Sequence, residues 1–304
     1  MRLFLAYIFV ILLWTTTPLA IKWSVEGPGF LFAVTSRMAI GLFCVLFVLT
    51  LLRHPLVWHR KAWLTYLAVA VQIYGSMILV YWSAQYIPSG WISVIFGLEP
   101  LMTALLAIGI LKEKNLSLSS FCAYCLGVYG LYVMFGSALE LGKNAILGIG
   151  GILMATFFQS IGAVWIKQIG AGLPALGQVA GSLTLALPLY LLTWTTVDGQ
   201  WPDALTDINI AAIAYLGVIA TTLGFSLYYY LLTHLPAVQV ALISLMTPVL
   251  ALMLGHWLNG EPITRQIVIG TAFILAALIM HEVLGRLAKP LAIPIRKQKN
   301  KPLH

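Results

Sequence analysis

Charge is scarce in this chain: only 9% of its 304 residues are Asp, Glu, Lys or Arg, and 61% are hydrophobic. A soluble domain carries about 25% charged residues. A chain with so little charge cannot cover itself with a surface that water tolerates, which excludes a soluble globular protein. The sequence therefore predicts an integral membrane protein of the all-α class.

Cysteine and enzyme motifs are also scarce. The three cysteines, Cys44, Cys122 and Cys125, fall within apolar runs, which excludes a disulfide framework. The sequence has no Gly-rich phosphate loop, no metal-ligand spacing and no candidate triad, so we expect neither an enzyme nor a cofactor. The net charge is +8, but Lys and Arg cluster in a few loops and near the C-terminus. That distribution is typical of membrane insertion and argues against a nucleic-acid partner.

Long hydrophobic runs are what the chain has in abundance. A membrane-spanning helix needs about 20 apolar residues, and ten runs of this kind are joined by short loops. With the N-terminus placed inside, most Lys and Arg residues fall at cytoplasmic positions, which predicts that both termini are cytoplasmic. The basic tail 285–304 is then expected to lie against anionic headgroups of the lipid bilayer. The predicted spans are 3–21, 30–52, 63–83, 88–111, 118–136, 146–166, 175–194, 209–231, 237–258 and 264–284.

The two halves of the chain repeat. The segment YWSAQYIPSGWISVIFGLEPLMTALLAIGILKEK aligns without a gap with YYLLTHLPAVQVALISLMTPVLALMLGHWLNGEP. Because each half holds five spans, an odd number, the second half must enter the membrane inverted. Inverted repeats, here 3–136 and 146–284, are an architecture of secondary transporters, with the substrate site near the membrane midplane. The matched pairs, each 148 residues apart, are Tyr81 and Tyr229, Pro88 and Pro236, Pro100 and Pro248, and Glu113 and Glu261.

The repeat segments also resemble a known family. TLGFSLYYYLLTHLPAVQVALISLMTPVLALMLGHWLNGEPITRQIVIGTAFILAALIM, which starts at Thr222, resembles the second repeat of EamA-type transporters in the drug/metabolite transporter superfamily. GPGFLFAVTSRMAIGLFCVLFVL and IPSGWISVIFGLEPLMTALLAIGILKEK resemble the first repeat. The resemblance covers about residues 3–284. It implies a ten-helix bundle in the bacterial inner membrane that moves small organic metabolites or drugs, such as amino acids, often outward.

Glu99 is the only ionisable residue in the apolar run 91–111. A charged side chain at the bilayer centre costs about 3 kcal/mol on insertion scales. Its counterpart in the second repeat is Thr247, so the fold does not itself require a carboxyl at this position. We therefore expect Glu99 to couple transport to protons or to bind a substrate ammonium group. The alternative is a protonated carboxyl that forms hydrogen bonds between helices.

Arg37 is the only basic residue deep in a predicted span. It lies about 12 Å along its helix from the outer end, and Glu99 lies about 17 Å along its own helix from the same side. The two side chains are therefore close enough in depth to pair, and a neutralising pair would explain why the membrane tolerates both. The family often has an arginine in segments such as TSRMAIG, which favours a structural or gating use for Arg37.

Further polar and aromatic residues fall on faces that are predicted to point inward. Aromatic walls with a few polar groups suit an amphipathic organic solute, whereas hydrogen bonding between helices is the alternative for any one residue. Pro100 and Pro248 are expected to kink their helices near the midplane, because proline removes a backbone donor. Besides Glu99 and Arg37, the candidates for the substrate pathway are Trp14, Gln72, Tyr74, Tyr81, Gln159, Tyr228, Ser244 and Thr247.

Other classes of membrane protein give different expectations. A lipid scramblase or flippase, or a non-enzymatic scaffold, would be indifferent to neutralisation of Glu99. A channel usually builds a selectivity ring from oligomer symmetry, whereas this chain supplies its own internal two-fold repeat. Glu113 and Glu261 end matching helices, and we expect each to interact with the N-terminus of the helix that follows it.

Overall fold

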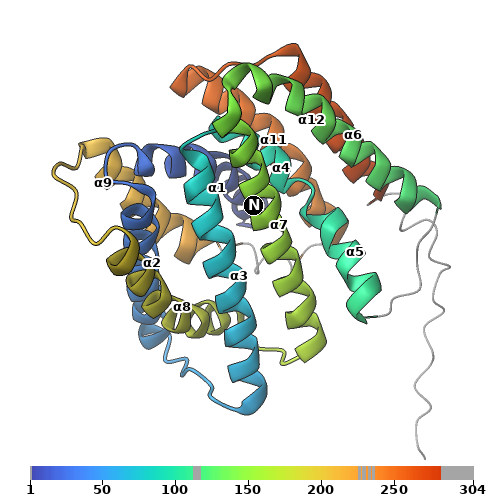
Figure 1. The fold of residues 1–304 in the computed structure, drawn as a ribbon. Helices are drawn as coiled ribbons and strands as arrows, with labels where there is room; N and C mark the ends of the chain where they lie inside the picture. Colours follow the sequence, from blue (N-terminus) through green and yellow to red (C-terminus); the bar gives the residue numbers. More distant parts are fainter. Residues whose placement is uncertain are drawn as a thin grey trace, which may run out of the picture.

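The structure, a computed structural model, describes residues 2–111, 118–224, 227, 231, 234 and 237–281. Every regular element in these ranges is a helix, as the sequence predicts (Figure 1). The basic tail 285–304 lies outside the described residues. The helices are α1 (Arg2–Val25), α2 (Phe30–Leu51), α3 (Arg60–Ala84), α4 (Ser89–Phe96), α5 (Glu99–Leu111), α6 (Leu118–Leu141), α7 (Lys143–Ile169), α8 (Ala175–Val197), α9 (Asp207–Ala214), the π-helical η1 (Tyr215–Leu223), α11 (Ala237–Asn259) and α12 (Arg265–Ile279).

Each of the ten predicted spans coincides with helix in the described ranges. Length and composition support a multi-pass membrane protein, because many of these helices can cross a bilayer. Six are long and apolar enough: Leu3–Val25, Phe30–Leu51, Arg60–Ala84, Ser89–Leu111, Lys143–Ile169 and Ala175–Val197. Four shorter apolar helices are Phe121–Gly136, Asp207–Leu223, Leu245–Asn259 and Arg265–Ile279.

The predicted span 88–111 is broken into α4 and α5. The break lies at Gly97 and Leu98, where the Leu98 N–H turns back to donate to the Ile95 carbonyl at 3.0 Å. Pro100 follows in the first turn of α5, and it has no N–H to offer the carbonyl of Phe96. In the second half of the chain, α11 continues through Pro248 without an interruption.

The predicted span 209–231 begins as α9 and continues as the π-helical η1. Glycines let η1 approach α2 closely: a Cβ on Gly217 would lie 2.6 Å from Ile40 Cγ2. A Cβ on Gly41 of α2 would likewise lie 2.9 Å from Thr221 Cγ2. Within η1, the Thr221 hydroxyl donates a hydrogen bond to the Leu216 carbonyl, five residues earlier, at 2.9 Å.

Two helix pairs define the interior and one edge of the bundle. α3 and α7 pack side by side through the middle, and α5 packs against α7 (Figure 1). At the edge, α6 and α12 pack through facing glycines: a Cβ on Gly130 would lie 2.8 Å from the Gly270 carbonyl oxygen. α2 and α8 pack together on the opposite side of α3. Helices from both halves of the chain therefore surround the space beside α3, α5 and α7.

Candidate functional site

A cavity of about 720 Å³ lies within the bundle, and its walls come from α1, α2, α3, α4, α5, α7 and α11. Sites for small organic ligands commonly have volumes of about 300–1,000 Å³, so this cavity can hold one solute of that class. Helices of both halves of the chain meet at it. Residues named from the sequence that line it are Trp14, Arg37, Gln72, Glu99, Pro100, Gln159 and Thr247.

Glu99 enters the cavity at the broken helix. It is the first residue of α5, and its side chain is half-buried. The Ser160 hydroxyl of α7 donates to the Glu99 backbone carbonyl at 3.3 Å, which fixes the start of α5 against α7. Within the described ranges, no ion pair or hydrogen bond occupies the Glu99 carboxyl group. A carboxyl at a helix N-terminus is favourably placed with respect to the helix dipole, and this one faces the cavity.

Arg37 reaches the cavity from α2 and is nearly completely buried, with 7% of its surface exposed. Its Nη1 donates to the Tyr81 hydroxyl at 3.3 Å, and its guanidinium carbon lies 5.9 Å from the centre of the Tyr81 ring. Nε has no hydrogen-bond partner among the described residues. Arg37 and Glu99 both line the cavity but do not form an ion pair with each other. The cavity wall therefore presents a carboxyl group and a guanidinium group that are not paired with each other.

Two glutamine amides add neutral polar groups to the wall. Gln72 comes from α3 and Gln159 from α7. Gly162 of α7 allows the close approach of Gln72, because a Cβ at this position would lie 2.5 Å from the Gln72 Cβ. The Gln159 side-chain oxygen is buried and has no hydrogen-bond partner within the described ranges. An unsatisfied acceptor at a cavity wall is suited to a donor on a solute or to a water molecule.

Other residues named from the sequence lie elsewhere or are not described. Tyr81 is fully buried behind the cavity, where it bonds to Arg37. Tyr74 bonds to the Thr193 hydroxyl at 2.6 Å and joins α3 to α8. Pro248 is buried in α11 and is not one of the lining residues. Tyr228 and the side chain of Ser244 lie outside the described part of the chain.

The cavity also contains groups that the sequence reasoning did not assign to it. Helical spacing would have found several of them, because residues four apart share one face of a helix. Gln159 and Lys167 are eight residues apart on α7. Thr103 and Ala107 lie four and eight residues after Glu99 on α5. Lys167 was missed because it reads as an interface charge near the end of α7. The additional polar lining residues are Ser93, Thr103, Lys167 and His281.

Glu261 joins several helices at one end of the bundle. The prediction that Glu261 interacts with the N-terminus of the helix that follows it is wrong. Its carboxylate caps α4 instead: Oε1 accepts from the Ser89 N–H at 2.9 Å, and Oε2 accepts from the Ser89 hydroxyl at 3.0 Å and the Gly90 N–H at 3.3 Å. α12 has its own cap, since the Thr264 hydroxyl accepts from the Ile267 N–H at 3.3 Å. Glu113, the sequence counterpart, lies outside the described residues.

The cavity extends away from the Glu261 contact. Its lining on α5 runs from Glu99 to Ala107, and its lining on α7 runs from Gln159 to Lys167. Both helices end shortly afterwards, at Leu111 and Ile169. The cavity therefore approaches the end of the bundle where α5 and α7 finish, while Glu261 joins elements at the end where α4 begins.

Comparison with known proteins identifies relatives of similar sequence. Uncharacterized transporters cover nearly the whole chain: YoaV of Bacillus subtilis (strain 168) is 24% identical over 92% of this chain and 96% of its own. YedA of Escherichia coli K12, an uncharacterized inner membrane transporter, is 27% identical over 96% of this chain and 95% of its own. Protein PecM of Dickeya dadantii (strain 3937) is 24% identical over 79% of this chain and 78% of its own.

A solved structure and a family model agree with these relatives. A protein of known crystal structure shares the fold with a TM-score of 0.65 and 18% identity, over 94% of this chain and 99% of the other. The model of the EamA-like transporter family matches the chain twice, over residues 2–136 and 146–281. Together the two matches take in most of the sequence. The chain therefore belongs to the EamA-like transporter family.

Proposed function

We propose that this protein is a secondary transporter that exports a small organic metabolite or drug, such as an amino acid or a related solute, and that the cavity is its binding site. The observation that carries the proposal is the cavity itself. It is large enough for one such solute and it presents a carboxyl group and a guanidinium group that are not paired with each other. Polar amides and the Trp14 ring supply the remaining contacts that an amphipathic solute needs.

The proposed mechanism is alternating access between two inverted repeats, residues 3–136 and 146–284. The repeated sequence supports it, and the family model matches each of these regions separately. The sequence counterparts Glu99 and Thr247 both line the cavity, as expected for a site between two related halves. Two halves of similar structure and opposite orientation can rock between states of similar energy, with the solute held between them.

The proposed orientation supports export from the bacterial cytoplasm. The distribution of Lys and Arg favours an inner membrane protein with both termini in the cytoplasm. In that orientation α5 and α7 finish at the cytoplasmic side. The cavity reaches toward the same side, so the described conformation would receive solute from the cytoplasm.

Glu99 is the proposed coupling residue. Its carboxyl can carry a proton through the transport cycle or neutralise a substrate ammonium group, and the absence of an ion pair within the described ranges leaves it available for either task. Arg37 would then bind an acidic or polar part of the solute, with Tyr81 holding the guanidinium in place.

Transport by the purified protein in proteoliposomes tests this function. A panel of amino acids, nucleosides and cationic drugs would be measured with and without a proton gradient, for the wild type and for Glu99→Gln. We expect one solute class to move, to respond to the gradient, and to lose that response in Glu99→Gln. Glu26→Gln is the matched control, because Glu26 is an exposed carboxylate outside the cavity.

The outcomes separate the parts of the proposal. Solute movement that is identical in Glu99→Gln and the wild type, with no effect of the gradient, would remove the role of Glu99 and leave a facilitator. Movement of lipid between leaflets with no movement of any solute would contradict the transporter and favour a scramblase.

A further inference from the structure

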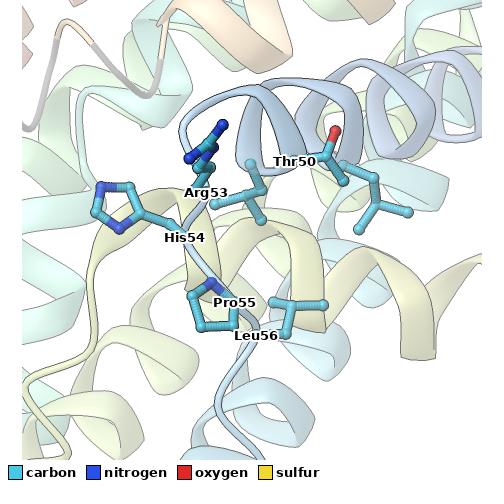
Figure 2. Close-up of a pocket in the computed structure, with 7 residues that line it drawn as sticks. Thr50, Arg53, His54, Pro55 and Leu56 are labelled. Atoms are coloured by element: carbon cyan, nitrogen blue, oxygen red, sulfur yellow. The ribbon is translucent and has the colours of Figure 1, made fainter.

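A second hollow, of about 480 Å³, lies at the far end of α2, where the chain turns toward α3 (Figure 2). None of its lining residues belongs to the solute cavity. One part of its surface is apolar and the other carries basic side chains. The residues that line it are Leu46, Leu49, Thr50, Arg53, His54, Pro55 and Leu56.

The backbone at the rim of this hollow has an unusual residue. Arg53 has φ 55°, and no other non-glycine residue of the described ranges has a positive φ. Its N–H donates to the Thr50 carbonyl at 3.1 Å, and the His54 N–H donates to the Leu49 carbonyl at 3.0 Å. This pair of hydrogen bonds is the Schellman arrangement, in which the left-handed position is usually glycine. Arginine is strained in this conformation, so a use for its side chain would explain its presence.

The loop that follows is fixed by its own contacts and leaves the basic groups exposed. The Tyr66 hydroxyl of α3 donates to the Val57 carbonyl at 2.9 Å, and the Trp58 ring packs edge-on against Tyr66 at 5.4 Å. Arg53 and His54 are both exposed, and their side chains project from the turn beside the hollow (Figure 2). Below them, Leu46 and Leu56 pack against the hydrophobic core, with Leu49 part of it.

Charge and position together identify the ligand chemistry. The loop and the start of α3 carry the basic sequence RHPLVWHRK, and the chain has no Asp or Glu between Glu26 and Glu99. α2 has 22 residues, which corresponds to about 33 Å of helix and places its end at the headgroup level of a bilayer. Exposed Trp58 and Trp63 are typical of that level. An occupant of this hollow must therefore combine an anionic group with an apolar chain.

We propose that this hollow binds one anionic phospholipid of the surrounding membrane. Its phosphate lies between Arg53 and His54, and one acyl chain follows Leu46, Leu49 and Leu56. A lipid bound at this position stabilises the C-terminal end of α2, the helix that contains the cavity residue Arg37. The alternative is that Arg53 and His54 only offset the partial negative charge at the C-terminus of α2.

Arg53→Gly tests the proposal, because glycine adopts the left-handed conformation without strain while the basic side chain is lost. The purified protein would be titrated with phosphatidylglycerol and with phosphatidylcholine, and bound lipid would be counted by native mass spectrometry. We expect the wild type to retain phosphatidylglycerol preferentially and Arg53→Gly to bind it roughly fivefold more weakly, since one basic residue near an anionic surface contributes on that order. Arg265→Gln, which removes an exposed charge elsewhere, should bind like the wild type.

A second measurement keeps the test independent of folding. Because glycine relieves the strain at this position, the midpoint of thermal unfolding in detergent without lipid should be no lower for Arg53→Gly than for the wild type. Added phosphatidylglycerol should raise the midpoint of the wild type more than that of Arg53→Gly. Equal binding of the two lipids by the wild type, or equal retention of phosphatidylglycerol by Arg53→Gly, would overturn the proposal. A lower midpoint of Arg53→Gly without lipid, together with unchanged binding, would favour the dipole alternative.

Discussion

Glu261 and Ser89 lie in opposite halves of the chain and are joined by two hydrogen bonds, from the Ser89 N–H to Oε1 at 2.9 Å and from the Ser89 hydroxyl to Oε2 at 3.0 Å. The Asn259 amide donates to the same carboxylate at 3.1 Å, and the Trp23 indole donates to Asn259 at 3.2 Å. One buried carboxylate thus connects the start of α4 with the end of α11 and, through Asn259, with α1. This connection lies at the end of the bundle where α4 begins, and the cavity extends toward the opposite end.

Glu261→Gln should destabilise the protein by about 2 kcal/mol, because it replaces charge-assisted hydrogen bonds at a buried helix N-terminus with neutral ones and points an amide N–H₂ at donors. Thermal and denaturant unfolding in detergent measure this loss. Glu26→Gln is the control, since Glu26 has an exposed side chain at the same end of the bundle. A Glu261→Gln protein as stable as Glu26→Gln would mean that the cap contributes nothing.

A double-mutant cycle isolates the Ser89 contribution. Ser89→Ala removes the hydroxyl but keeps the backbone N–H that donates to Oε1. We expect it to cost about 1 kcal/mol alone and less in the Glu261→Gln background, because contacting groups are not additive. Strictly additive costs would show that the two side chains act independently.

Gly162→Ala should disturb the cavity wall. The added Cβ would lie 2.5 Å from the Gln72 Cβ, so α3 and α7 must separate or Gln72 must move. Overpacking of this kind typically costs about 1–3 kcal/mol. Gly150→Ala on the same helix is the matched control, because a Cβ at Gly150 meets nothing within 4 Å. We expect a lower unfolding midpoint for Gly162→Ala than for Gly150→Ala. Equal midpoints would contradict the close packing at Gly162.

Hydrophobic runs were sufficient to predict which segments are helical, and isolated polar residues within them indicated several of the residues that line the cavity. Glu99 and Arg37 stand out because charge is expensive in an apolar span, and both line the cavity. Tyr74 is also a polar residue in an apolar span, but its hydroxyl bonds to Thr193 and joins α3 to α8. The sequence of one helix does not show which neighbouring helix each of its faces contacts.

The remaining features depend on a local turn or on contacts between distant segments. A proline signals a weak point in the span 88–111, but the local turn at Gly97 and Leu98 decides where α4 ends. The partner of Glu261 is 172 residues away, and no local pattern at the end of α11 identifies it. The π-helical η1 has no sequence signal of its own, since its glycine contacts with α2 arise only after the helices pack.

The central claim is that the solute occupies the cavity beside Glu99, and cysteine accessibility in the cavity tests it most directly. Single cysteines at Thr103 and Ala163, two lining positions, would be introduced after replacement of Cys44, Cys122 and Cys125. Phe43, which is 72% exposed on the outer face of α2, is the control position. The variants would be labelled with a thiol reagent with and without the transported member of the solute panel.

We predict that labelling at Thr103→Cys and Ala163→Cys abolishes transport and that the transported solute slows the labelling, while labelling at Phe43→Cys does neither. Unimpaired transport after complete labelling of both cavity positions, or solute protection only at Phe43→Cys, would contradict the account.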